Sequence, residues 1–341
     1  MSLTQLPGEI LISIFSLLGP EFFHQDVGRL TISRRWCDFA WSVYAEHLEL
    51  PTAKSLMAFT ADKGLLLRVQ PYLTSLSLSL DNINLGRQLP VTDGDRGRWM
   101  TEVQSSLALL TVGLRQCSRL HNLKLQLQVV GGYLLLDSLA DLVEIPHLTS
   151  LYLDAAGSGR LYPPGAKEAD HVCFCHRLNS LLRTLRQLYC RMDFACQWLL
   201  MQFPPATGGP PFLDVQEVIV NISLPMVPGT AREFEKFLYS RRCHLTGLVS
   251  GGYRGLIPLK QVLHCEAAAL GYYMKNRQMV RLISHELTDV GVFAYDCLNG
   301  EQLRLKSGSE WDAEGTVVDW DEVWPGPVDN EVVTMYDMRD I

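Results

Sequence analysis

The stretch LTSLSL at residues 73–78 decides how most of the chain folds, because it returns as LTSLYL at residues 148–153 and as LHNLKL at residues 120–125. Leucine fills the first, fourth and sixth places of all three stretches. The alternation over the last three places predicts a short strand with one buried face. Looser copies of this leucine unit are Leu185-Leu188-Cys190, Val215-Val218-Val220 and Leu245-Leu248-Ser250.

The spacing of the leucine units leaves room for a helix between successive strands. Their first residues are 47, 28, 37, 30 and 30 positions apart. Helical patterns occupy residues 101–117, 174–185 and 231–243. A strand followed by a helix at a period near 30 residues resembles a leucine-rich repeat, in which each unit buries its leucines against its neighbours. The apolar residues at helical spacing in the first helix are Val103, Leu107, Leu110 and Leu114.

The resemblance implies an α/β fold in which an irregular leucine-rich-repeat-like solenoid presents its strands on a concave face. A regular repeat has asparagine eight residues after the first leucine, where its side chain satisfies backbone groups in the turn. This sequence lacks that series, so a non-repetitive α/β domain with leucine-rich strands is the alternative. The residues at those positions are Asp81, Gln128, Ala156, Asp193, Ser223 and Tyr253.

The stretch LTQLPGEILISIFSLL at residues 3–18 predicts a helix with more apolar surface than its own core needs. Pro7 lies in the first turn, Glu9 lies near the positive end of the helix dipole, and Gly19-Pro20 ends the helix. At about 100° per residue, six apolar residues span an arc of about 160°, where about 100° suffices for packing. The excess predicts a second contact. The six residues are Leu17, Ile10, Ile14, Leu18, Leu11 and Phe15, and Ile12 widens the arc.

Residues 21–30 and 31–50 predict two more helices, the second with Trp36, Phe39, Ala40 and Val43 on one face. Three short helices make a core that is marginal alone, and a permanent partner would stabilise it. From residue 4 to 48, the order and spacing of the apolar and basic residues resemble an F-box. The matching residues are Leu6-Pro7-Gly8-Glu9-Ile10-Leu11, Ile14-Phe15, Leu18, Val27, Leu30, Ile32-Ser33-Arg34-Arg35-Trp36 and Phe39-Ala40.

The F-box resemblance implies a three-helix module that docks on a Skp-type adaptor. That adaptor would hang from a cullin scaffold carrying a RING subunit and a ubiquitin-conjugating enzyme. The alternative is an apolar helix that packs only on the rest of its own chain. The residues that would face the adaptor, or hold the surface that does, are Leu6, Pro7, Ile10, Leu11, Ile14, Phe15, Leu18, Val27, Leu30 and Trp36.

The last part of the chain predicts a cap on the open end of the repeat. Residues 259–276 and 278–287 are helix candidates, and residues 292–306 predict a hairpin turning at Asn299-Gly300. Residues 309–341 then carry ten acidic residues and one basic residue. They are interpreted either as a surface segment fixed by its tryptophans or as an acidic docking strip for a basic partner. The tryptophans are Trp311, Trp320 and Trp324.

Composition narrows the class of protein. The chain has 341 residues and a net charge of −7, which gives no general attraction for nucleic acid. No uncharged apolar run reaches membrane-spanning length, and the N-terminal stretch lacks the positive charge of a secretory signal. Nine cysteines without a repeating spacing are interpreted as reduced thiols. We therefore expect an intracellular protein, cytoplasmic, nuclear or both, with no membrane partner.

No known catalytic motif is complete. His285-Glu286 begins like a zinc-protease helix, but Asp289 stands where the second histidine ligand belongs. HVCFCH at residues 171–176 matches no common zinc spacing, and Cys173 and Cys175 alternate as buried strand residues do. The sequence thus predicts no cofactor, no metal and no catalytic residue.

The favoured hypothesis is a non-enzymatic substrate-recognition subunit of an SCF-type cullin-RING ubiquitin ligase. Its parts would be an F-box at residues 1–50, a repeat region at 51–258 that binds an unknown protein target, and a cap with an acidic tail at 259–341. The alternatives are an F-box scaffold that acts outside the ligase and an enzyme whose site the sequence does not reveal.

Overall fold

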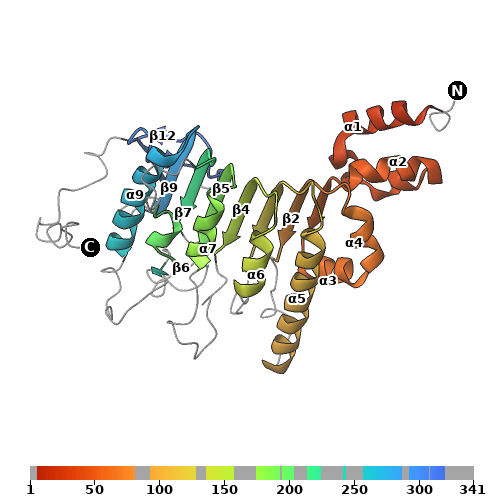
Figure 1. Cartoon of the computed structure of the whole chain (residues 1–341), viewed down its shortest axis with the longest axis horizontal. Helices are drawn as coiled ribbons and strands as arrows, with labels where there is room; N and C mark the ends of the chain where they lie inside the picture. The colour runs from red at the N-terminus through yellow and green to blue at the C-terminus, as the bar shows by residue number, and fades with distance from the viewer. Residues whose placement is uncertain are drawn as a thin grey trace, which may run out of the picture.

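A ten-stranded sheet forms the centre of a mixed α/β fold (Figure 1). The computed structural model describes residues 6–80, 93–127, 136–156, 174–192, 194–202, 213–223, 241–242, 256–285, 292–306 and 308–318. In order across the sheet, the strands are β1 (His47–Leu50), β2 (Ser75–Ser79), β3 (Asn122–Gln126), β4 (Ser150–Ala155), β5 (Gln187–Met192), β7 (Glu217–Asn221), β9 (Met279–His285), β10 (Val292–Asp296), β11 (Gln302–Leu305) and β12 (Thr316–Val317). Two further strands, β6 (Phe194–Ala195) and β8 (Arg241–Arg242), pair with each other.

Helices cover one face of this sheet. Leu56 in α3, Leu107 in α5, Leu178 in α7 and Leu263 in α9 are fully buried in the same core cluster as the strand leucines. The helices described are α1 (Gly8–Gln25), α2 (Arg34–Tyr44), α3 (Ala53–Ala61), α4 (Lys63–Val69), α5 (Asp93–Leu114), α6 (Leu136–Val143), α7 (Phe174–Leu181) and α9 (Leu256–Tyr273), with short 3-10 turns η2 (Val27–Thr31) and η4 (Gln197–Leu199).

The strands from β1 to β9 are parallel, and their register aligns the leucine units. Five of the six units form neighbouring strands of the sheet, as predicted, while the sixth lies outside the described residues. Each aligned side chain is buried against the helices, except the half-buried Leu48. One row is Leu48, Leu76, Leu123, Leu151, Leu188, Val218 and Val280, and the next is Leu50, Leu78, Leu125, Leu153, Cys190, Val220 and Leu282.

The sheet begins earlier than the first predicted leucine unit. Strand β1 lies inside the range 1–50 that the sequence analysis gave to the N-terminal module, and it pairs with β2 through Leu48 and Leu50. In register, Ala45 takes the place that leucine takes at residue 73, and it is buried. Because this unit begins with alanine rather than leucine, the leucine pattern did not predict β1.

Residues 278–287 were predicted as a helix, and this prediction was wrong. Residues 279–285 form β9, which pairs with β7 and so extends the parallel sheet past residue 258. Val280 and Leu282 are buried beneath the helices, while Ile283 is buried on the opposite face. Burial on both faces removes the alternation that marks a strand, and a continuous apolar run does not distinguish strand from helix.

Three other predicted elements are found. Helix α5 includes residues 101–114 of the helix predicted at 101–117, with Val103, Leu107, Leu110 and Leu114 buried. Helix α9 matches residues 259–276 closely, and β10 and β11 form the expected antiparallel hairpin with Gly300 at φ +81° in its turn. Residues 231–243 lie outside the described residues, except for Arg241–Arg242 in β8.

Cys175 lies in α7, where it is buried, so its expected place in a strand was wrong. The strand-like alternation of Cys173 and Cys175 was a coincidence of two nearby cysteines, of which Cys173 lies outside the described residues. All seven cysteines in the described ranges are free thiols. None of the described helices is both long enough and apolar enough to cross a membrane.

The N-terminal module, defined as α1, η2 and α2, has a core of its own. Gly19 has φ +73° and breaks α1 at the predicted place, but helical structure resumes at Pro20 and continues to Gln25. The Ser33 side chain accepts a hydrogen bond from the backbone N–H of Trp36, 3.1 Å away, and caps α2. The module core consists of Leu11, Phe15, Phe23, Leu30, Trp36, Ala40 and Val43.

We predict that Leu123→Ala or Leu151→Ala lowers the free energy of unfolding by about 2–5 kcal/mol, because each removes a buried side chain from the aligned rows and leaves a cavity. Urea titration measures the loss. Asn122→Ala, on the exposed side of the same strand, is the control. A loss no larger than that of the control would place these leucines outside the core.

Candidate interaction surfaces

The N-terminal module leaves apolar side chains uncovered outside its core. Along α1, Leu17 is 88% exposed and Ile10 is 47% exposed. Ile10, Ile14, Leu17 and Leu18 recur at helical spacing and form one flank of the helix, adjacent to the buried face. We call the exposed apolar residues of this module the module surface: Ile10, Ile12, Leu17, Leu18, Val27 and Ile32.

Burial divides the ten residues that the F-box resemblance singled out. Leu11, Phe15, Leu30 and Trp36 are buried in the module core, so they support the surface and cannot themselves contact a partner. The sequence pattern predicted both roles for the set but could not separate them. Sequence reasoning also left Leu17 and Ile32 out of the set, although both are among the exposed apolar residues. The exposed or half-buried members of the set are Leu6, Pro7, Ile10, Ile14, Leu18 and Val27.

Hydrogen bonds from long side chains hold the segments of the module together. The Nη2 of Arg35 donates to the carbonyl oxygen of Leu6 at 2.8 Å, which ties the start of α1 to α2. The indole Nε1 of Trp36 donates to the carbonyl oxygen of Arg29 at 2.7 Å. The Trp36 ring also packs edge-on against the Phe15 ring, with the ring centroids 4.6 Å apart. Trp36 therefore holds in place η2 and α1, the two elements that carry most of the module surface.

The second surface is the strand face, the side of the sheet opposite the helices. Its side chains alternate with the buried leucines along each strand. On β2 they are three half-buried serines, and on β3 they are two exposed polar residues and one that is half-buried. Polar side chains on both strands give this end of the strand face hydrogen-bonding groups without an apolar patch. They are Ser75, Ser77 and Ser79 on β2 and Asn122, Lys124 and Gln126 on β3.

Aromatic side chains replace the small polar ones at β4 and β5. Tyr152 and Tyr189 are neighbours in register, with ring centroids 6.4 Å apart, and the Lys124 Nζ lies 5.0 Å from the Tyr152 centroid. The Tyr189 hydroxyl donates to the Glu217 carboxylate, which also accepts from Gln187 Nε2 at 3.0 Å. Burial and the hydrogen bond to Glu217 raise the pKa of Tyr189, so it remains a hydrogen-bond donor at neutral pH.

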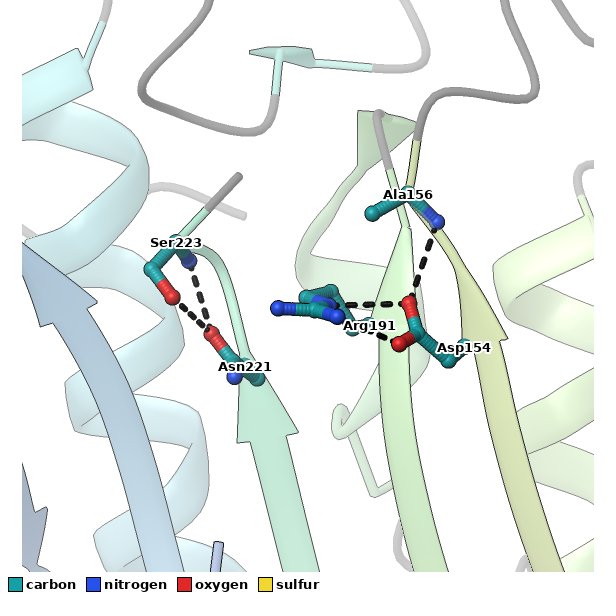
Figure 2. A network of polar contacts seen from close by, with 5 residues as sticks. All are labelled: Asp154, Ala156, Arg191, Asn221 and Ser223. Atoms are coloured by element: carbon teal, nitrogen blue, oxygen red, sulfur yellow. Dashed lines mark hydrogen bonds and ion pairs between the residues drawn. The ribbon is translucent and has the colours of Figure 1, made fainter. Parts of the chain in front are cut away.

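A polar network lies at the carboxyl ends of β4, β5 and β7 (Figure 2). The Asp154 carboxylate pairs with the Arg191 guanidinium, with Nε and Oδ1 2.8 Å apart, and also accepts from the backbone N–H of Ala156 at 3.3 Å. The Asn221 Oδ1 accepts from the backbone N–H of Ser223 at 2.9 Å. Asp154 and Asn221 are both buried, so these bonds satisfy groups that water does not reach.

Two of the six positions where a regular repeat has asparagine lie in this network. Ala156 and Ser223 stand eight residues after their leucine-unit starts, where the regular repeat has asparagine. Here their backbone N–H groups are the donors, and the acceptors are side chains two residues earlier.

The C-terminal part of the described chain covers the strand face from β4 towards β11. The Trp311 ring stacks on Tyr152, with centroids 4.7 Å apart and planes 23° apart, and the Arg191 guanidinium carbon lies 5.2 Å from its centroid. Trp311 is buried with Ile219, Ile283, Ala294, Leu303 and Leu305. The interpretation of a segment fixed by its tryptophans is confirmed for Trp311, while Trp320 and Trp324 lie outside the described residues.

Two of the buried thiols, those of Cys117 and Cys190, are poor nucleophiles. Burial raises the pKa of Cys190 to about 12 and that of Cys117 to about 11, so both stay protonated at neutral pH. The zinc-protease motif falls partly outside the described residues, which include the backbone of His285 in β9 but not Glu286.

The chain matched no protein-family model, no curated protein and no solved structure. The module surface and the strand face are the observations on which a function is proposed below.

We predict that Asp154→Ala lowers the free energy of unfolding by about 3–5 kcal/mol, because it leaves the Arg191 guanidinium largely buried without its carboxylate. Urea titration measures this loss. Asp141→Ala breaks an exposed ion pair with Arg115 and is the matched control, with an expected loss of about 0.2–1 kcal/mol. Equal losses for the two variants would show that the network contributes no more than a surface pair.

Proposed function

We propose that the protein is a non-catalytic substrate-recognition subunit of an SCF-type cullin-RING ubiquitin ligase. In this proposal the N-terminal module is an F-box that binds a Skp-type adaptor, and the strand face binds a protein target. The observation that carries the proposal is the module surface, since it is apolar although the module core beneath it is already filled.

The module surface has the geometry of a helix-docking contact. Single exposed apolar residues are normal on proteins, but a flank of them on one helix marks an interaction site. Ile10, Ile14 and Leu17 follow the spacing by which a helix presents one side to a partner. An adaptor that covers this flank would bury Leu17, the most exposed of the large apolar side chains described.

We further propose that the sheet is a leucine-rich-repeat-like solenoid with a C-terminal cap. Three observations support this. The parallel strands follow chain order, the register aligns equivalent positions of successive units, and the helices cover only one face. The antiparallel strands β10 to β12 would be the cap, because they end the parallel series.

The arrangement separates the two binding roles in space. The N-terminal module lies at the β1 end of the sheet, and β12 lies at the opposite end (Figure 1). A target held on the strand face would be kept close to a conjugating enzyme on the cullin scaffold. The gain in ubiquitylation rate would come from effective concentration and orientation rather than from groups on this chain.

An adaptor-bound scaffold that acts outside the ligase uses the same module surface, so the surface alone does not separate the two functions. Co-purification with a cullin separates them. Binding of the adaptor without a cullin would favour the scaffold.

We predict that Ile10→Ala combined with Leu17→Ala weakens adaptor binding at least about tenfold, because interface energy concentrates in a few apolar anchors. Neither residue belongs to the module core, so the fold is retained. Pull-down of a purified Skp-type adaptor measures the effect. Ser13→Ala, exposed on the same helix, is the control. Unchanged capture by the double variant would exclude the F-box proposal.

We predict that deletion of residues 1–44 leaves target binding intact and stops target turnover. This cut keeps Glu46, whose carbonyl oxygen accepts from the backbone N–H of Ser75 at 3.0 Å, and so keeps β1 in the sheet. Affinity purification with mass spectrometry under proteasome inhibition compares the truncated and full-length chains. Targets should be enriched on the truncated chain. The receptor proposal would be abandoned if no captured protein changed in abundance or ubiquitylation.

A further inference from the structure

The segment at residues 308–318 is held on the strand face by one buried side chain. Trp311 is 8% exposed, and every other residue of the segment is exposed or half-buried. Its backbone pairing with the sheet consists of the two residues of β12, opposite Leu303 and Arg304 of β11, and of the Val318 N–H, which donates to the carbonyl oxygen of Gln302. An aromatic anchor surrounded by weakly buried contacts is the way a peptide docks on a separate protein.

The strand face supplies the partners that such a peptide needs. Tyr152 and Arg191 offer a stacking face and a cation to the indole ring. Arg281 on β9 donates from Nη1 to the carbonyl oxygen of Ala313 at 2.9 Å and thereby fixes the backbone after the anchor. These contacts recognise an aromatic residue within a tight turn, which the backbone N–H of Ala313 closes by donating to the carbonyl oxygen of Glu310 at 3.2 Å.

Arg281 also has a hydrogen-bond donor that residues 308–318 do not use. Its side chain is buried, and its Nε has no hydrogen-bond partner among the described residues. A buried guanidinium N–H without a partner is costly, and a carboxylate is its best acceptor. The segment at 308–318 therefore occupies the site without satisfying it. A partner segment that brings a carboxylate to Arg281 gains an interaction that the present occupant lacks.

Acidic residues flank the anchor in the present occupant. Glu310 and Asp312, the neighbours of Trp311 in sequence, are both exposed. The sequence repeats the composition shortly afterwards, since Glu310-Trp311-Asp312 is followed by Asp319-Trp320-Asp321.

We infer that the strand face around Tyr152, Arg191 and Arg281 is a binding site for a peptide turn that carries a tryptophan between carboxylates, and that residues 310–313 of the chain occupy it as an internal competitor. The inference rests on the proposed function only in taking this peptide to be part of the target. A target would bind when the segment opens locally, which its few buried contacts allow.

The test uses the full-length chain and a fluorescent peptide that copies residues 308–318. A tethered competitor acts at an effective concentration on the order of millimolar, so the parent chain should bind the peptide weakly. Trp311→Ala combined with Trp320→Ala removes the anchor and the second tryptophan that has carboxylates on both sides in the sequence. We expect this variant to bind the peptide at least about tenfold more tightly than the parent does, as measured by fluorescence anisotropy.

Two controls locate the binding. Adding Tyr152→Ala to the double variant should weaken peptide binding at least about tenfold, since it removes the stacking face. Adding Tyr272→Ala should leave binding unchanged, because Tyr272 lies 80% exposed on α9. A peptide with alanine in place of tryptophan should not bind. If Tyr152→Ala and Tyr272→Ala changed the peptide affinity equally, the assignment of the binding site to Tyr152 would be wrong.

Hydrogen exchange of the unmodified chain provides an independent measurement. The backbone N–H of Val318, bonded to the carbonyl oxygen of Gln302 at 2.9 Å, should exchange much faster than the N–H groups within β9. The inference would be overturned if the Val318 N–H and the β9 N–H groups all exchanged only when the whole protein unfolds. The segment would then be a fixed part of the core. The inference would also be overturned if the double variant failed to fold.

Failure of this inference is distinguishable from failure of the proposed function. The double variant should bind the Skp-type adaptor as the parent does, because neither substituted residue belongs to the module surface or the module core. If the adaptor binds and the peptide does not, the peptide site is wrong and the receptor proposal stands. If the peptide binds and the adaptor does not, the reverse holds.

Discussion

The structure depends on the in-register burial of two rows of apolar side chains along one face of the parallel strands. From Leu76 to Val280 and from Leu78 to Leu282, equivalent positions of successive units lie side by side beneath the helices. No single unit has enough apolar neighbours to bury its own leucines, so each strand is stabilised by the next. Because the helices cover one face only, the other face is left available for polar and aromatic side chains.

The two surfaces follow from where burial is complete and where it is not. In the N-terminal module, seven residues fill a small core, and the flank of α1 that carries Ile10 and Leu17 has nothing to pack against in the described chain. At the other end, apolar residues on the strand face are covered by Trp311 from the same chain. One surface is thus open to a partner, while the other is already occupied by a segment with a single anchor.

Much of the fold could be predicted from the sequence, because the leucine units and the helical spacing in α5 are local patterns. The first strand was missed because alanine takes the leading place at residue 45, and β9 was misread as a helix because both of its faces are buried. The roles of Leu11 and Phe15 could not be separated from those of Ile10 and Leu17, since all lie in one apolar arc. Only the packing of α2 against α1 decides which of them are buried. Arg281 and Asp154 act through contacts distant in sequence, which no local pattern reveals.

The central claim is that the N-terminal module binds a Skp-type adaptor through its uncovered apolar flank and without using the strand face. Hydrogen-exchange mass spectrometry of the full chain, with and without the purified adaptor, tests it most directly. The account predicts that the adaptor slows exchange in α1 and η2 and leaves strands β2 to β5 unchanged. Two results would contradict this account. One is that the adaptor slows exchange in β2 to β5 but not in α1, and the other is that saturating adaptor changes exchange nowhere.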